Sequence, residues 1–291
     1  MLFVGISSAQ LQSPEEIFGF KVGTDRKLAD YSQMLSFHRQ LANNSDRVIL
    51  KEIGKSSEGQ PMILLFISTP ENLSQLDKWK TISSELARAR INEDKAREHA
   101  KNGKTILWID GGMHATERAH GQMTAELAYR VATEESSEMK KIRDNVILLL
   151  MPVINPDGMR LVVDWYRKNL GTPYETTGPP VLYQKYVGHD NNRDWFMFTQ
   201  KETRLAIDIH RDFKPHITHD MHQMGTRGAR MFVPPFRDPF DPNIHPLLIE
   251  GQAQVGIAMA SALIADGKSG IVYNEQYDLW TPARQYMLYH G

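Results

Sequence analysis

Cysteine is absent from the 291-residue sequence. Disulfide scaffolds, iron–sulfur clusters, thiolate zinc sites and cysteine nucleophiles are therefore excluded, and any metal must be held by His, Asp or Glu. An excess of one charge is also absent, because Lys and Arg number 34 and Asp and Glu number 35. This balance argues against a broad electrostatic surface for nucleic acid or an acidic membrane, although it is compatible with a local basic pocket.

Long apolar runs are missing as well. No uninterrupted run approaches the ~18–20 residues of a membrane span, so we expect none. At the N-terminus, a short apolar stretch over residues 2–6 precedes Ser7-Ser8-Ala9, whose small side chains suit signal-peptide cleavage after Ala9. A basic region in front of this stretch is lacking. Two interpretations of residues 1–20 stay open, a frayed N-terminal arm and a signal-peptide remnant, and the second implies a secreted or periplasmic protein.

Short apolar segments bounded by glycine or proline alternate with helical patterns along the chain. We expect strands over residues 47–53, 61–68, 105–110 and 145–151, and a further strand that begins at 217–220 and runs toward Gly225. We expect helices over residues 25–41, 119–133, 199–213 and 244–265, and a charged helical segment over 71–101. This alternation predicts an α/β fold with three α/β/α layers and a mixed, largely parallel, twisted central sheet. We predict one domain over residues 21–291.

The sharpest local feature follows the strand predicted at 105–110. His114 and Glu117 come directly after Gly111-Gly112, where the chain turns from the strand into a helix. In open α/β sheets the ligand crevice lies outside the carboxyl ends of the strands, so both side chains can point at one cation there. The pair alone is better explained by a glutamate that favours a helix N-terminus beside an unrelated histidine.

A hydrolytic zinc site typically has three protein ligands and one open position. The segment 217–225 supplies a second histidine at another strand end. His222 lies nearest the glycine that ends this segment, whereas His219, three residues earlier, should face the opposite side of the strand. We therefore predict one Zn²⁺ held by His114, Glu117 and His222.

Over roughly residues 47–290 the sequence resembles the zinc metallocarboxypeptidase family, the carboxypeptidase A-like peptidases. The resemblance rests on six motifs in the order of the family, at residues 52–61, 112–117, 152–158, 165–168, 190–195 and 220–222. Each motif is weak alone, but together they are specific. The form Asp220-Met221-His222-Gln223-Met224-Gly225 resembles a bacterial branch. The resemblance implies a zinc-dependent peptidase that removes the C-terminal residue of peptides or proteins.

The resemblance also implies roles for individual residues. Asp190 is similar to the carboxylate that accepts a hydrogen bond from a zinc-bound histidine. Asn192 and Arg193 resemble the pair that grips the free C-terminal carboxylate of the substrate, which the planar guanidinium fork matches. Arg167 resembles the arginine that stabilises the oxyanion, and Tyr273 lies in the tyrosine segment expected to contact substrate.

The sequence departs from the family at two places. Thr116 stands where the family often has an arginine, which affects one substrate contact. The general base of the family is a glutamate on a later strand, and the layout places it beyond Gly291, because Glu275 precedes the expected strand. We therefore expect a C-terminally incomplete catalytic domain that is weak or inactive, since a missing base costs typically 10²–10⁴-fold in rate.

Two other functions stay open. The first is a zinc amidase or deacylase of the same fold that acts on peptidoglycan stem peptides or acyl-amino acids, and a profile of released products would separate it from a peptidase. The second is a non-catalytic zinc-containing module that binds C-terminal peptides. The absent glutamate favours such a module, whereas Arg167 argues against it, because a binder has little use for an oxyanion donor.

Overall fold

The computed structural model describes residues 11–184, 190–225, 227–275, 277 and 279–281. The described chain divides into two compact units. One runs up to residue 194 and adds 198–222, and the other contains 195–197 and the residues from 223 onward. The single domain expected over 21–291 stays a prediction. Residues 1–10, which carry the signal-like stretch, lie outside the described residues.

Within the described part of the first unit, five strands form one sheet in the order β1-β2-β4-β3-β5. These strands are β1 (Val48–Lys55), β2 (Pro61–Ile67), β3 (Thr105–Asp110), β4 (Val146–Met151) and β5 (Ile217–Asp220). The pairs β1–β2 and β2–β4 are antiparallel, whereas β4–β3 and β3–β5 are parallel. The sheet is mixed, as expected, but its parallel part is confined to β4, β3 and β5.

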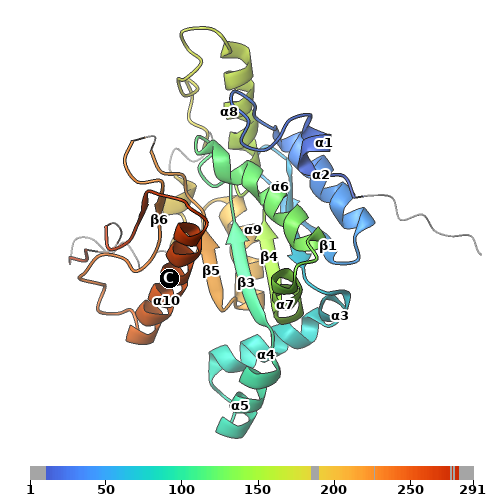
Figure 1. The fold of residues 1–291 in the computed structure, drawn as a ribbon, viewed down its shortest axis with the longest axis vertical. Helices are drawn as coiled ribbons and strands as arrows, with labels where there is room; N and C mark the ends of the chain where they lie inside the picture. The colour runs from blue at the N-terminus through green and yellow to red at the C-terminus, as the bar shows by residue number, and fades with distance from the viewer. Residues whose placement is uncertain (1–10, 185–189, 226, 276, 278, 282–291) are drawn as a thin grey trace, which may run out of the picture. The chain divides into compact units, whose positions relative to one another are not determined.

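Helices cover both faces of this sheet, with α6 and α9 on opposite sides (Figure 1). The helices of the first unit are α1 (Pro14–Phe18), α2 (Tyr31–Asn44), α3 (Pro70–Leu73), α4 (Leu76–Arg88), α5 (Glu93–Asn102), α6 (Arg118–Thr133), α7 (Ser137–Asn145), α8 (Pro156–Asn169) and α9 (Lys201–Phe213), with a 3-10 turn, η1, at Asn191–Arg193. The three α/β/α layers predicted from the sequence are therefore present.

Strand β2 shows how the sequence builds these layers. Ile63, Leu65 and Ile67 belong to the core that contains α2 and α6. Phe66 points to the other face, where its ring centroid lies 5.2 Å from that of Phe213 on α9. Because side chains alternate along a strand, an almost continuous apolar run supplies both faces of a buried sheet.

The N-terminal region is part of this core. Ser13 caps α1 in a capping box with Glu16, and Phe18 is 5% exposed, with its ring centroid 6.0 Å from that of Phe37 on α2. Asp30 caps α2, so that this helix begins at Tyr31 rather than at residue 25 as predicted.

One histidine is buried in the core without an obvious function. His38 on α2 is fully buried, and neither ring nitrogen has a hydrogen-bond partner among the described residues. Burial lowers its pKa to about 3, because a protonated ring would lose its hydration. Below the unfolded-state pKa of about 6.5, His38 is therefore protonated in the unfolded chain but stays neutral in the folded chain. The free energy of unfolding falls as the pH falls, because the unfolded chain binds the additional proton.

We expect His38→Leu to flatten this acid sensitivity. Between pH 7 and pH 5 the wild-type protein should lose about 2 kcal/mol more unfolding free energy than the variant, since one excess proton on the unfolded chain costs about 1.4 kcal/mol per pH unit. Urea unfolding followed by circular dichroism at pH 7, 6 and 5 measures the difference. Parallel pH profiles for the two proteins would show that His38 is not the group responsible.

The second unit is described by itself. It contains α10 (Pro246–Ala265) and the parallel pair β6 (Met231–Phe232) and β7 (Ile271–Val272). The centroid of the Phe232 ring lies 5.8 Å from that of Phe236 and 5.3 Å from that of Tyr277. These aromatic contacts form a small apolar cluster in this unit.

Helix α10 coincides with the long apolar helix predicted over residues 244–265. An 18-residue window of this 20-residue helix has a mean hydropathy of 1.5, which meets the length and composition of a span. The helix contains no uninterrupted apolar run of that length, because polar residues such as Gln252 and Gln254 interrupt it. Core helices of globular proteins meet the same two criteria, so α10 by itself does not define a membrane protein.

Candidate metal centre

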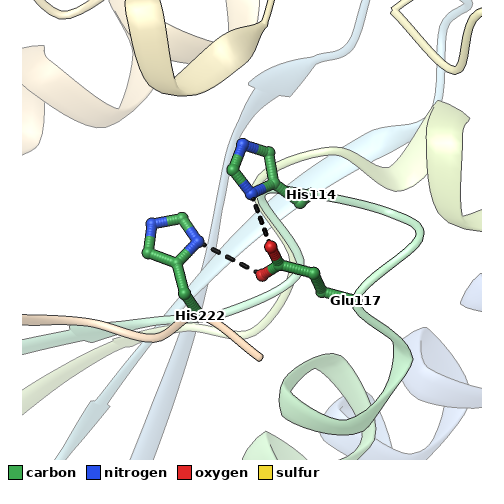
Figure 2. A group of neighbouring side chains, drawn as sticks. All are labelled: His114, Glu117 and His222. Atoms are coloured by element: carbon green, nitrogen blue, oxygen red, sulfur yellow. Dashed lines mark hydrogen bonds and ion pairs between the residues drawn. The ribbon is translucent and has the colours of Figure 1, made fainter. Parts of the chain in front are cut away.

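The three predicted ligands meet at the carboxyl ends of two neighbouring strands. Asp110 and Asp220, the last residues of β3 and β5, are paired in register. His114 follows β3 after the turn at Gly111-Gly112, and His222 comes two residues after β5. Glu117 occupies the N-cap position of α6, but its side chain makes no capping hydrogen bond and is turned toward the two histidines (Figure 2).

Both imidazole rings direct Nδ1 at the same carboxylate. Nδ1 of His114 lies 2.9 Å from Oε1 of Glu117, and Nδ1 of His222 lies 3.2 Å from Oε2. One ligand atom from each residue falls within a group in which all separations are at most 4.8 Å. Figure 2 shows the three side chains converging on one point.

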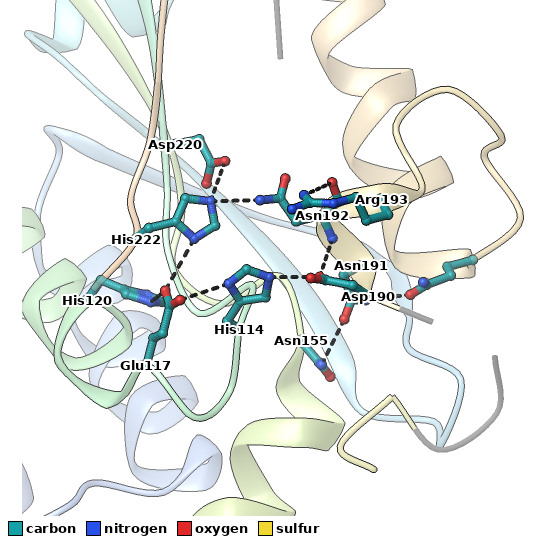
Figure 3. Close-up of polar contacts among 11 residues, drawn as sticks. His114, Glu117, His120, Asn155, Asp190, Asn191, Asn192, Arg193, Asp220 and His222 are labelled. Atoms are coloured by element: carbon teal, nitrogen blue, oxygen red, sulfur yellow. Dashed lines mark hydrogen bonds and ion pairs between the residues drawn. The ribbon is translucent and has the colours of Figure 1, made fainter. Parts of the chain in front are cut away.

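The outward-facing nitrogens of the two rings also contact carboxylates. Nε2 of His114 lies 2.7 Å from Oδ1 of Asp190, and Nε2 of His222 lies 3.0 Å from Oδ2 of Asp220 (Figure 3). A hydrogen bond at Nε2 favours the proton on that nitrogen and leaves the Nδ1 lone pair facing the centre. Asp190 therefore lies where the sequence placed it, and Asp220 makes the corresponding contact with the other ring.

The site attracts positive charge. Burial opposes protonation of His114, but hydrogen bonds to Asp190 and Glu117 outweigh it and raise the pKa to about 9. Burial likewise opposes protonation of His222, whereas Asp220 and Glu117 raise its pKa to about 10. Three carboxylates around two imidazoles favour cations in this space, whether protons or a metal ion.

The donor set suits zinc. Zinc accepts imidazole nitrogen and carboxylate oxygen, and a set of two histidines and one glutamate is one that catalytic zinc sites use. Each ring has a carboxylate behind it, which is the usual outer-shell arrangement around zinc-bound histidine. His114, Glu117 and His222 could therefore hold one zinc ion. His219, on β5, is not a member of this group among the described residues.

Two of the three residues assigned to substrate binding lie beside the centre. Asn192 is 4% exposed, and its side-chain amide lies 3.0 Å from Nε2 of His222. Arg193 is exposed, and its guanidinium donates to the backbone carbonyl of Asn192. Both belong to the short helix η1, which Asp190 begins by accepting a hydrogen bond from the Asn192 backbone at 2.8 Å. Substrate binding by this pair stays a prediction.

The structure does not bring Arg167 to the centre, contrary to the expected oxyanion role. Its guanidinium donates to Asp30, to Gln33 and to the backbone carbonyl of Leu28, near the start of α2. The reason is the continuous helix α8, which the sequence analysis did not predict. Arg167 is eleven residues beyond Pro156, about 16 Å along the helix axis. Its presence therefore no longer argues against a binding module.

Tyr273 and Glu275 lie in the second unit. Tyr273 follows β7 and is 48% exposed, and Glu275 is also exposed. The substrate-binding role of Tyr273 stays a prediction. Gln276 and Asp278, from the same predicted approach to the catalytic strand, lie outside the described residues.

His120 is also part of the site, although the sequence did not predict it. His120 is 5% exposed, and its Nε2 lies 3.2 Å from Oε2 of Glu117. A signal for it was present, because residues three apart on a helix share a face and His120 follows Glu117 by three. The full pattern is therefore H-x-x-E-x-x-H rather than H-x-x-E.

Comparisons with known proteins identify the family of the chain. The family model for zinc carboxypeptidase matches residues 34–230, which is more than half of the chain. The chain therefore belongs to the zinc carboxypeptidase family. Carboxypeptidase 2 of Trichophyton rubrum is 25% identical over 239 residues, covering 80% of this chain and 36% of that protein. Carboxypeptidase 2 of Trichophyton tonsurans is 26% identical over the same length. The chain thus spans little more than a third of the length of these curated relatives.

Solved structures agree on the fold. The metallo-carboxypeptidase from Burkholderia cenocepacia has a TM-score of 0.57 at 17% identity, with 86% of this chain and 54% of that chain covered. Carboxypeptidase A from Helicoverpa armigera has a TM-score of 0.54 at 17% identity, with 89% and 62% covered. These similarities confirm the carboxypeptidase-like α/β fold.

Proposed function

We propose that the chain is the zinc-binding part of a metallocarboxypeptidase that hydrolyses the C-terminal peptide bond of its substrate. The observation that carries the proposal is the convergence of His114, Glu117 and His222 at the carboxyl ends of β3 and β5. A zinc ion held there would supply Lewis acidity toward a scissile carbonyl and activate water for hydrolysis. Membership in the zinc carboxypeptidase family supports the same activity.

Residues around the three ligands orient them and provide a place for the substrate. Asp190 and Asp220 accept hydrogen bonds at Nε2 of the two histidines, and thereby orient both rings toward the centre. The exposed guanidinium of Arg193 is one residue from Asn192, whose amide contacts His222. A free peptide carboxylate bound by this guanidinium would leave its neighbouring peptide bond near the centre, which is the geometry that an exopeptidase needs.

We further propose that the protein works outside the cytosol, as a secreted or periplasmic peptidase. The support is the apolar stretch followed by Ser7-Ser8-Ala9 in the sequence. The bacterial origin suggested by residues 220–225 likewise stays a prediction.

The substrate assignment is tested with the terminal carboxylate and Arg193 together. We expect amidation of a peptide's C-terminus to weaken its binding to the zinc-loaded protein by roughly 10- to 100-fold, because a charge-assisted bidentate pair is lost. In Arg193→Ala the same amidation should change binding little, so that the two losses are not additive. Dissociation constants for the peptide acid and the peptide amide measure this, together with release of the C-terminal residue.

The matched control is Arg160→Ala. Arg160 is an exposed arginine on α8 that pairs with Glu58, so its loss should leave the preference for the free acid intact. Equal binding of peptide acid and peptide amide by the wild-type protein would contradict the exopeptidase function.

A further inference from the structure

His120 joins the turn before the metal centre to one of its ligands. It lies in the first turn of α6, and its ring lies beside the Glu117 carboxylate (Figure 3). Both of its ring nitrogens are engaged. The backbone N–H of Gly112 donates to Nδ1 at 2.6 Å, and Nε2 lies 3.2 Å from Oε2 of Glu117. With a side chain 5% exposed, the ring has little access to solvent.

These two contacts determine where the ring carries its proton. A backbone N–H can only donate, so Nδ1 of His120 must accept and therefore has no hydrogen. The proton of the neutral ring is then on Nε2, which donates to the carboxylate of Glu117. The direction of this hydrogen bond is thus imposed by the backbone of the turn.

The hydrogen bond leaves the carboxylate able to bind a cation. A carboxylate has two oxygens and about four lone-pair sites, so Oε2 can accept from His120 and keep a lone pair for the centre. The hydrogen bond also restrains the Glu117 side chain, which would otherwise lose rotamer freedom when it binds a metal. The same ring also accepts a hydrogen bond from the backbone of Gly112, two residues before His114, so Glu117 and the turn are held by one side chain.

We propose that His120 is a positioning residue for the metal centre. Through its Nε2–H it holds Glu117 in the orientation that completes the ligand set, and through Nδ1 it anchors the turn that carries His114. This inference rests on the proposed function, since it assumes that the three residues bind zinc. Its role is distinct from that of Asp190 and Asp220, which act on the two histidines rather than on the carboxylate.

Two substitutions separate the two contacts of the ring. His120→Asn places a carbonyl oxygen near the position of Nδ1, so it can still accept from Gly112 but is too short to reach Glu117. His120→Gln places an amide N–H near the position of Nε2, so it can still donate to Glu117 but leaves the Gly112 N–H without an acceptor. Zinc dissociation constants from competition with a chromophoric chelator and thermal midpoints of the metal-free proteins are measured for both.

We expect His120→Asn to weaken zinc binding by roughly 10- to 100-fold, as loss of an outer-shell partner does, while its metal-free thermal midpoint stays near that of the wild-type protein. We expect His120→Gln to bind zinc within about threefold of the wild-type protein and to melt several degrees lower, because a buried N–H is left unpaired. A residue with a purely structural role would change both quantities in parallel in both variants.

The outcomes are distinguishable. Wild-type zinc affinity in His120→Asn, or an equal loss of affinity in the two variants, would overturn the positioning role while leaving the zinc site standing. Failure of the wild-type protein to bind zinc would overturn the proposed function and this role together. The ¹⁵N spectrum of the metal-free protein is an independent check, because a proton on Nδ1 of His120 would refute the inference whatever the zinc result.

Discussion

Replacing His222 with alanine is expected to strip zinc from the protein during dialysis. The variant loses one of three ligand atoms that lie within 4.8 Å of one another. Loss of a direct ligand should exceed the roughly 10- to 100-fold loss of affinity that removal of an outer-shell partner causes. Elemental analysis after dialysis, compared with the wild-type protein, measures the zinc content per chain.

His219→Ala is the matched control for this result. His219 lies on β5, three residues before His222, and it is not a member of the candidate metal group. We expect this variant to retain one zinc per chain. Full zinc retention by His222→Ala, or equal losses in the two variants, would contradict the ligand assignment.

Gly112→Ala should be among the most destabilising single substitutions in the first unit. Gly112 has a φ of +64°, and an added Cβ would lie 2.7 Å from Cγ1 and 3.0 Å from Cα of Val153. The left-handed backbone costs an alanine about 1–2 kcal/mol, and the overpacking against Val153 adds about 1–3 kcal/mol. We expect a loss of about 2–5 kcal/mol in unfolding free energy, measured by urea denaturation.

The turn has no simple way to relieve this clash. Gly111 and Gly112 are held by backbone hydrogen bonds to Ile154 and Asn155, at 2.9 and 3.0 Å, which extend the parallel pairing of β3 with β4 beyond the strands. Gly171→Ala is the control, because Gly171 has a φ of +74° with nothing within 4 Å of the added Cβ. Gly171→Ala should lower the unfolding free energy only by the cost of the left-handed backbone, about 1–2 kcal/mol. Equal losses in the two variants would show that Val153 imposes no steric constraint.

The sheet and the ligand set could be predicted because each depends on a local signal. Strand β3 begins and ends at the predicted residues, because its apolar run is closed by Gly111 and leaves little choice of boundary. Strand β5 begins at Ile217 as predicted, but it ends at Asp220 instead of running on toward Gly225. Parallel neighbours bring their carboxyl ends to one edge, so motifs distant in sequence could be expected to meet there. His114, Glu117 and His222 follow from this rule, whereas Asp190 was expected only from the resemblance to the family.

The remaining features depend on long-range contacts. Helix α8 runs unbroken to Asn169, and Arg167 is held at its end by Asp30, Gln33 and a backbone carbonyl. Arg167 was expected at the centre from the resemblance alone, because no short motif encodes partners more than a hundred residues away. The two contacts of His120 likewise combine a backbone donor from the turn with a side chain on α6.

The pKa shift of Asp110, at the end of β3, could not be predicted from the sequence either. Burial and the neighbouring carboxylate of Asp220 raise the pKa of Asp110 well above its usual range. Asp110 accepts from Nε1 of Trp108 at 2.7 Å and is 2% exposed. At this strand edge it is Asp220 whose Oδ2 lies 3.0 Å from Nε2 of His222 and which therefore supports that ring. The different surroundings of these two aspartates become known only from the structure.

The central claim is that His114, Glu117 and His222 together hold one zinc ion. Anomalous diffraction at the zinc absorption edge, from crystals of the zinc-loaded protein, tests it most directly. The account predicts a single strong peak about 2.0–2.1 Å from Nδ1 of both histidines and about 2.0–2.2 Å from the Glu117 carboxylate. A peak at another histidine–carboxylate pair, such as His99 and Glu85, with none between these three side chains, would contradict it.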